Sequence, residues 1–541
     1  MPSSEIEIVA STNGESPNHI SSEVAAADVC AASAYGDLDR LRKLVEEDGG
    51  CVRKPDPNGY HAIQWAALNG HADVVHYIIE HGGDVNAADR STQTALHWAA
   101  VKGCISVADV LVQNGARVEA MDLNGYRAVH VAAQYGQTAF LNHIVAKYHA
   151  DYDAPDNDGR SPLHWAAFKG VPDTVRLLLF RDASQGRQDK AGCTPLHWAA
   201  IRGHMEICIV LVHAGQKHEL MMKDGAGLTP AELASDKGHR HIALFLSNAQ
   251  RAHSNQLKNV PYVGKLQSSG YAPILLGIVF TLFILFMNSV LLDSSLMKVT
   301  AAVGLWSWID VSLFFFSLVM FYRCCSKDPG YLRKSSHSNG HFEPEDPLLN
   351  IDLKNPNWDG NWSRLCPICK IIRPLRSKHC PTCNHCVEQF DHHCPWICNC
   401  VGKRNKWDFF VFLFFGAVTS AIAAIIAASR IWTMSLFVQT NETWIYDILL
   451  HRPGIVVFLL LDMLVFMAAM TLMIIQAAEI AGNITTNEWA NAKRYTYLQG
   501  PDGRFRNPYN RGCRKNCTEF FIQGYLDDDK NAWPSLRQDV P

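Results

Sequence analysis

Several features that often reveal a protein's class are missing from this sequence. Basic residues are not in excess: 49 Lys and Arg stand against 52 Asp and Glu, a net charge of -3. This argues against a nucleic-acid partner, which usually leaves a basic footprint. The first residues, MPSSEIEIVASTNGESPNH, contain no apolar run, so we expect no cleavable signal peptide. The 541 residues suffice for two or three domains.

Cysteine is not scarce, but it is not arranged as in a disulfide-rich secreted domain. Eight of the 17 cysteines lie in one short cluster, and the others are scattered along the chain. This is the pattern of a protein kept in a reducing, cytosolic environment, where closely spaced cysteines hold metal ions.

Long apolar runs are present, and they place the chain in a membrane. Four stretches reach the roughly 20 residues that span a bilayer: 272–292, 299–322, 409–429 and 455–478. The first and third carry no formal charge. The second contains Asp310 and the fourth Asp462, which we expect to face the interior of the helix bundle. The alternative, four buried core helices of a soluble protein, is disfavoured by the length of all four.

Basic residues near the span ends predict the orientation of the chain. They gather before the first span, after the second, before the third and after the fourth. The other two loops contain only Lys298 and, between spans three and four, Arg430 and Arg452. Both termini and the segment 324–407 should therefore be cytosolic. A glycosylation sequon at Asn441 falls on the opposite side, but so close to the membrane that we expect it to stay unmodified.

The N-terminal half is repetitive. The segments IQWAALNGH, LHWAAVKG, VHVAAQYG, LHWAAFKG and LHWAAIRGH recur at steps of 33, 33, 34 and 33 residues, and such a period indicates a solenoid. The segments SPLH from Ser161 and TPLH from Thr194 match the T-P-L-H turn, so residues 26–251 resemble about seven ankyrin repeats. Such an array has no chemistry of its own and offers a long concave surface to other proteins.

Two side chains recur in these repeats. We expect the recurring tryptophan to belong to the core between repeats, and the recurring histidine to bond to backbone near the turn rather than to a metal. The residues concerned are Trp65, Trp98, Trp165 and Trp198, and His97, His130, His164 and His197.

Twelve cysteines and histidines lie within the 35 residues from Cys366 to Cys400, in the order C-x2-C-x9-HC-x2-C-xHC-x4-DHHC-x3-C-x-C. Two tetrahedral zinc sites need eight ligands, so side chains remain for chemistry. Residues two apart in an extended segment point the same way. His392 can therefore reach the Cys394 thiol, and Asp391 can hold the imidazole in the correct tautomer, as in a nucleophile–base–orienter triad.

This motif resembles that of the DHHC family of protein S-acyltransferases, over roughly residues 272–521. TTNE from Thr485 to Glu488 resembles the family's T-T-x-E motif, and DPG from Asp328 resembles its D-P-G motif. NPYNRG from Asn507, with Asn516, resembles its C-terminal packing segment. In the family two zinc sites interleave. Carried over, one site takes Cys366, Cys369, His379 and Cys386, and the other takes Cys380, Cys383, His393 and Cys400.

The resemblance also implies roles for single residues. Cys394 would be the nucleophile that carries the acyl group, His392 its base, Asp391 the residue that orients His392, and Thr486 a support for Asp391. Both zinc sites would be closed and therefore structural, with His385 and Cys398 as bystanders. The acyl chain would lie in a cavity among the spans, for which the candidates are Trp396, Phe409, Phe412 and Thr419.

Small residues around Thr419 in the third span support two interpretations. They leave room for acyl chains at or beyond palmitoyl, because overfilling a packed site is destabilising. Alternatively, they simply let the helices pack closely.

The function implied by the resemblance is transfer of a long acyl chain, typically palmitoyl, from acyl-CoA to cysteine thiols of proteins, with two structural Zn²⁺ ions. Ankyrin repeats before four spans resemble one branch of the family, most of all its plant members. They would recruit cytosolic or membrane-associated protein substrates. The location implied is the Golgi, the ER or another endomembrane, or the plasma membrane. The alternative is a catalytically inactive adaptor, tethered to the membrane, whose ankyrin repeats and zinc module only bind partners. A third class, an ankyrin-bearing ion channel, is disfavoured because this sequence has no pore-like re-entrant segment between the spans.

The expected fold is dominated by α-helices: an ankyrin-repeat solenoid, then a four-helix transmembrane bundle with a cytosolic double-zinc cysteine-rich domain. The expected divisions are a disordered N-terminus (1–25), the ankyrin repeats (26–251), a linker (252–271), spans one and two (272–323), the cytosolic zinc domain (324–407), spans three and four (408–480) and a cytosolic tail (481–541).

Overall fold

The computed structural model describes residues 22–258, 270–292, 300–332, 348, 362–435, 452–500 and 502–526. It divides into two compact units, Met1–Gln250 with His341–Asp352, and Arg251–Gly340 with Leu353–Pro541. Most of the N-terminus expected to be disordered, most of the linker, Asn441 and the end of the tail lie outside the described residues. The first helix begins at Ser22 and so includes the last residues of that N-terminal segment.

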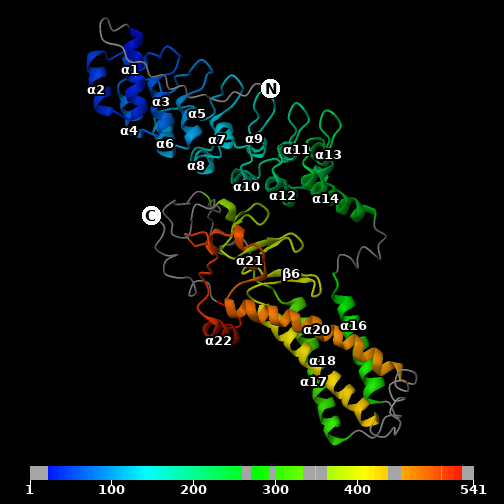
Figure 1. Cartoon of the computed structure of the whole chain (residues 1–541). Helices are drawn as coiled ribbons and strands as arrows, with labels where there is room; N and C mark the ends of the chain where they lie inside the picture. Colours follow the sequence, from blue (N-terminus) through cyan, green and yellow to red (C-terminus); the bar gives the residue numbers. More distant parts are fainter. Residues whose placement is uncertain are drawn as a thin grey trace, which may run out of the picture. The chain divides into compact units, whose positions relative to one another are not determined.

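The first unit is a row of paired helices (Figure 1). They are α1 (Ser22–Tyr35), α2 (Leu38–Glu47), α3 (Ala62–Asn69), α4 (Ala72–Glu80), α5 (Ala95–Lys102), α6 (Ile105–Gln113), α7 (Ala128–Tyr135), α8 (Thr138–Tyr148), α9 (Pro162–Lys169), α10 (Pro172–Phe180), α11 (Pro195–Arg202), α12 (Met205–Ala214), α13 (Pro230–Asp236) and α14 (Arg240–Lys258), with 3-10 turns at Cys51–Arg53 and Lys217–Met221. The first helix of one pair packs on that of the next, as α3 on α5 and α7 on α9.

The recurring histidine and tryptophan tie each repeat together. In α5 the backbone N–H of Thr94 donates to His97 Nδ1 at 3.2 Å, and His97 Nε2 lies 2.9 Å from the carbonyl oxygen of Tyr126 in the next repeat. The Trp98 indole is buried and donates to Asp89 Oδ2 at 3.1 Å. The four recurring histidines all bond to backbone, as predicted. Of the tryptophans, Trp98 belongs to the core, whereas Trp65, Trp165 and Trp198 are half-buried.

In the second unit, four of the described helices are long and apolar enough to cross a membrane. They are α16 (Ala272–Phe286) with a π-helical turn at Met287–Leu291, α17 (Ala301–Ser326), α18 (Lys406–Ser435) and α20 (Pro453–Gly482). Helix α18 packs on both α17 and α20, and α16 packs on α20 (Figure 1). Asp310 and Asp462 are 3% and 4% exposed, so both face the bundle interior as predicted. The fold class predicted from the sequence is confirmed.

A module of short antiparallel strands follows α17. The strands are β1 (Tyr331–Leu332), β2 (Leu365–Cys366), β3 (Ile371–Ile372), β4 (Lys378–Cys380), β5 (His385–Val387), β6 (His392–Cys394) and β7 (Asn399–Val401). They form the sheets β1-β5-β4, β2-β3 and β6-β7. After α20 come α21 (Thr486–Ala490), 3-10 turns at Ala492–Arg494 and Thr496–Leu498, and α22 (Cys513–Gln523).

A buried ion pair joins this module to the end of α20. The Arg376 guanidinium makes two hydrogen bonds to Glu488, from Nε to Oε1 at 2.8 Å and from Nη2 to Oε2 at 2.9 Å. Both side chains are 2% exposed. The guanidinium also donates to Asn483 Oδ1 at 3.0 Å and lies over the Tyr509 ring. One side chain thus connects the strand module, the last residues of the fourth span and the C-terminal segment.

The C-terminal segment also caps the C-terminal end of α20 by hydrogen bonds to its last carbonyl groups. Asn516 donates to the carbonyl oxygen of Ala481 at 2.8 Å, and Asn507 donates to that of Gly482 at 2.8 Å. These bonds satisfy carbonyl groups that have no partner within a helix.

Replacing Arg376 should destabilise the second unit strongly. Arg376→Met leaves the Glu488 carboxylate buried without its partner, which costs about 3–5 kcal/mol. Thermal unfolding of the detergent-solubilised protein measures the loss. The matched control is Arg404→Met, because Arg404 is 60% exposed and pairs with Asp328 at 3.5 Å, a kind of pair that contributes little. Equal melting temperatures for the two variants would contradict this role of Arg376.

Candidate active site and metal centres

The structure brings together the residues of each predicted ligand set. One set is Cys366, Cys369, His379 and Cys386, the other is Cys380, Cys383, His393 and Cys400, and the ligand atoms within each set lie within 4.8 Å of one another. Three sulfur atoms and one imidazole nitrogen suit a tetrahedral Zn²⁺ ion. Because four ligands fill that coordination, neither site leaves a position for a substrate.

The strand register determines how the two ligand sets interleave. Across the β4–β5 hairpin His379 faces Cys386, and across the β6–β7 hairpin His393 faces Cys400. Cys380 follows His379 directly, and successive side chains of a strand point to opposite faces. One face of the β4–β5 hairpin therefore carries His379 and Cys386 of the first ligand set, and the opposite face carries Cys380 of the second set.

The same alternation separates the two neighbouring histidines of β6. His393 belongs to a metal set, whereas His392 is grouped with Asp391 and Cys394. His392 Nδ1 lies 2.7 Å from Asp391 Oδ2, and because a carboxylate only accepts, this nitrogen must be the donor. The Cys394 thiol, two residues further along the same strand, is close enough to the imidazole to raise the pKa of His392. The three residues are therefore ordered as carboxylate, imidazole and thiol.

The electrostatic surroundings favour a charged imidazole. Burial raises the pKa of Asp391, but Lys406 and His392 outweigh it and hold that pKa below its ordinary value. Burial lowers the pKa of His392, but the Asp391 carboxylate and the Cys394 thiol outweigh it and raise the pKa to about 9. A protonated imidazole beside a thiol stabilises the thiolate, which is the reactive nucleophile.

The T-T-x-E segment has two roles at once. Thr485 caps α21 in a capping box with Glu488, the arrangement that this sequence pattern commonly indicates. Glu488 at the same time binds Arg376. The next residue, Thr486, donates to Asp391 Oδ2 from its hydroxyl at 2.9 Å and to Oδ1 from its backbone N–H at 3.0 Å. The contact predicted between Thr486 and Asp391 is present.

Three further polar residues surround Asp391, and sequence reasoning did not assign them to the site. Lys406 Nζ donates to Asp391 Oδ1 at 2.7 Å, and Gln476 Nε2 donates to Oδ2 at 3.3 Å. Glu479 accepts from Gln476 at 2.7 Å. In the sequence Lys406 is one of several basic residues flanking the third span. Gln476 and Glu479 offered one signal, polar residues three apart at the end of an apolar run.

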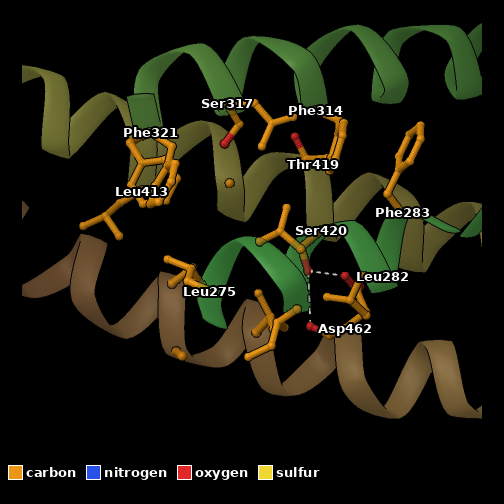
Figure 2. A pocket seen from close by; sticks show the side chains of 18 of the residues that line it. Leu275, Leu282, Phe283, Phe314, Ser317, Phe321, Leu413, Thr419, Ser420 and Asp462 are labelled. Carbon is orange, nitrogen blue, oxygen red and sulfur yellow. Dashed lines mark hydrogen bonds between the residues drawn. The ribbon is translucent and has the colours of Figure 1, made fainter. Parts of the chain in front are cut away.

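An apolar cavity of about 420 Å³ opens beside Cys394, among the four spans. Three of its labelled lining residues, Leu275, Phe321 and Leu413, come from different spans (Figure 2). Trp396, Phe409, Phe412 and Thr419, the residues predicted for an acyl cavity, all line it. Phe409 also packs edge-on against the His392 ring, with centroids 5.6 Å apart.

Polar groups occur deeper in this cavity. The Ser420 hydroxyl donates to Asp462 Oδ1 at 2.7 Å and lies 3.2 Å from the Asp462 carbonyl oxygen (Figure 2). Asp310 lines the cavity as well. Ser420 follows Phe409 by 11 residues of the same helix, a rise of about 16 Å. The apolar part of the cavity thus extends for three turns of α18.

The remaining motif residues hold the module on the spans. Asp328 Oδ1 accepts from the backbone of Gly330 at 2.8 Å, which forms the turn into β1. Asn399 donates to the carbonyl oxygens of Cys324 and Lys327 at the end of α17, both at 2.9 Å. His385 and Cys398, expected to be bystanders, are exposed and belong to neither ligand set.

Comparison with known proteins gives the same assignment for both parts of the chain. The DHHC palmitoyltransferase family matches residues 361–493, and ankyrin repeats match residues 29–122, 118–189 and 169–257. Probable protein S-acyltransferase 23 of Arabidopsis thaliana is 56% identical over 532 residues, which cover 98% of this chain and 99% of that protein. The chain therefore belongs to the DHHC family of protein S-acyltransferases.

More distant matches cover smaller parts. Palmitoyltransferase ZDHHC17 of Homo sapiens is 29% identical over 233 residues, 40% of this chain and 35% of that protein. Among solved structures, the human ASB11 ankyrin repeat domain matches 40% of this chain and 96% of that chain, at 24% identity and a TM-score of 0.37.

Replacing each of the two neighbouring histidines of β6 should affect zinc content and reaction rate differently. His393→Ala removes a metal ligand, and structural zinc contributes folding free energy directly. We therefore expect that variant to be poorly expressed or short of zinc. His392→Ala should keep its zinc and its fold but lose rate. Zinc content per chain and yield after purification check both expectations, and identical behaviour of the two variants would refute the separation of roles.

Proposed function

We propose that this protein transfers a palmitoyl group from palmitoyl-CoA to cysteine thiols of proteins through a thioester on Cys394. The observation that carries this proposal is the position of Cys394. Cys394 lines the apolar cavity, and it follows His392 by two residues of β6, so the two side chains leave the strand on the same face. A nucleophile at the mouth of a long apolar cavity suits a substrate with a reactive carbonyl at one end and a hydrocarbon chain at the other.

The mechanism has two thioester exchanges. His392 accepts the proton of the Cys394 thiol, and the thiolate attacks the carbonyl carbon of palmitoyl-CoA. The bond to the CoA sulfur breaks, and CoA leaves with the proton from His392. A substrate cysteine then loses its proton to His392, attacks the acyl-Cys394 thioester and takes the acyl group, while the Cys394 thiolate regains the proton. One thioester replaces another in each step, so neither needs a large free-energy difference.

Asp391 and Thr486 act through His392. Asp391 fixes the imidazole with Nδ1 as donor, which leaves the opposite nitrogen for the thiol, and Thr486 holds Asp391 in place. The two ligand sets would hold Zn²⁺, which supplies rigidity to strands of two or three residues that could not stay folded alone.

The orientation from the basic residues fits this chemistry. With both termini and the metal module cytosolic, the acyl chain lies in the span bundle while the CoA head group stays in the cytosol. An endomembrane such as the Golgi or ER, or the plasma membrane, would be the location. The ankyrin repeats would bind protein substrates, since repeat arrays present extended surfaces for other proteins.

Self-acylation with labelled palmitoyl-CoA tests the proposal and separates it from an inactive adaptor. Purified wild-type protein should take up the label, and Cys394→Ser should take up none while its zinc content stays at two ions per chain. Cys398→Ser is the matched control, because Cys398 is an exposed cysteine of the same module and its loss should leave labelling unchanged. An unlabelled wild-type protein would favour the adaptor.

Replacing Thr419 should change the acyl chains that the enzyme accepts. Thr419→Phe fills part of the cavity, so we expect the preference to move toward acyl-CoAs shorter than palmitoyl by about 10-fold or more, the discrimination that one or two methylenes provide. Competition among acyl-CoAs of graded length measures it.

The control for this change lies on the same helix. Ile425 is 67% exposed on α18 and is not among the cavity-lining residues, so Ile425→Phe adds a ring without filling the cavity. If Thr419→Phe lowered stability but kept the preference for palmitoyl, the small residues of this helix would serve packing alone.

A further inference from the structure

Lys406 lies between two buried carboxylates, those of Asp391 and Glu479. It is the first residue of α18, its side chain is 12% exposed, and its ammonium reaches two carboxylates. Nζ lies 2.7 Å from Asp391 Oδ1 and 3.6 Å from Glu479 Oε2. The helices that contribute Lys406 and Glu479 are the third and fourth spans, so the contact forms where those spans meet the metal module.

The two carboxylates compete for the same neutral donors. Thr486 Oγ1 lies 2.9 Å from Asp391 Oδ2 and 3.1 Å from Glu479 Oε2. A threonine hydroxyl carries one proton and can donate to only one of them at a time. Gln476 Nε2 lies near the same two oxygens, at 3.3 and 2.7 Å. Glu479 therefore draws on the groups that should support Asp391.

Burial makes this competition costly. The side chain of Asp391 is fully buried and that of Glu479 is 9% exposed, so water cannot screen one carboxylate from the other. Like charges in such surroundings repel strongly. The ammonium of Lys406, with three N–H donors, is placed to offset both charges.

We propose that Lys406 is a positioning residue for the acyl transfer. It bridges Asp391 and Glu479, cancels their repulsion and fixes Asp391 Oδ1, so that Oδ2 stays directed to His392 and the Thr486 hydroxyl stays directed to Oδ2. This inference rests on the roles proposed above for Asp391, His392 and Cys394. Glu479 has no direct part in the chemistry, and it is the reason that a cation is needed at this point.

A purely structural role for Lys406 makes a different prediction. If Lys406 only helped the two spans to pack, removing Glu479 as well would add damage. If Lys406 acts by offsetting the second carboxylate, neutralising Glu479 should compensate for its loss. A double-variant comparison separates the two because it measures the coupling between the residues.

The experiment uses the full-length purified protein and measures the rate of self-acylation against palmitoyl-CoA concentration. Lys406→Met should lower kcat about 10- to 100-fold, the effect of a catalytic group displaced by about 1 Å. KM for palmitoyl-CoA should stay close to wild type, because Lys406 does not line the cavity. Lys406→Met/Glu479→Gln should recover most of the lost kcat, and Glu479→Gln alone should lose less than Lys406→Met. Zinc content should equal that of the wild type throughout.

Two results would overturn the inference: a wild-type kcat for Lys406→Met, or a double variant as slow as Lys406→Met alone. If Lys406→Met proves too unstable to purify, Lys406→Gln, alone and with Glu479→Gln, gives the same comparison, since it keeps a donor without the charge. Cys394→Ser is run beside them. A dead Cys394→Ser with a fully active Lys406→Met would reject the inference alone, whereas a labelled Cys394→Ser would reject the proposed function itself.

Discussion

The buried pair of Arg376 and Glu488 is the interaction on which the catalytic geometry depends. It holds the turn after the fourth span against the metal module, and this turn carries Thr486. A buried ion pair of this kind contributes little net stability compared with apolar packing, yet breaking it leaves an unpaired charge. The backbone of Arg376 is in the left-handed region, φ 62°. This ion pair therefore fixes the strand module relative to the end of the fourth span, although neither of its residues takes part in the chemistry.

The metal sites complement this contact from within the module. Strands of two or three residues have too few hydrogen bonds and too little apolar surface to persist alone. Because the β4–β5 hairpin contributes ligands to both sets, it fixes β2–β3 and β6–β7 relative to each other. His392 and His393 leave β6 on opposite faces, so His393 lies with its ligand set while Cys394, two residues after His392, lines the cavity.

Much of this arrangement could be predicted from the sequence, because it is encoded locally. Ligand spacing and strand alternation depend on neighbours in the chain, so the order of residues is enough to place His392 and His393 on opposite faces of a strand, and the family resemblance supplied the ligand set of His393. The repeat period and the apolar runs are equally local. The T-T-x-E segment both caps α21 and contacts Asp391, and only the first of these depends on residues close in the chain.

What the sequence did not reveal depends on distant segments meeting. Lys406 reads as one more basic residue at a span end, and Glu479 as the polar end of another span. Only the approach of α18 to α20 places both beside Asp391. The same holds for Arg376, whose partner lies 112 residues away.

The burial of Cys394 has a consequence for the lifetime of its thioester. Cys394 is 6% exposed, packs with Cys324, Ile397 and Phe409, and lines the apolar cavity. An acyl chain seated there would cover the remaining surface, so bulk water would have little access to the carbonyl carbon. Hydrolysis, the wasteful competitor of transfer, would be slow. The loaded enzyme would then behave as a store of activated acyl groups, discharged by the arrival of a protein thiol rather than by the solvent.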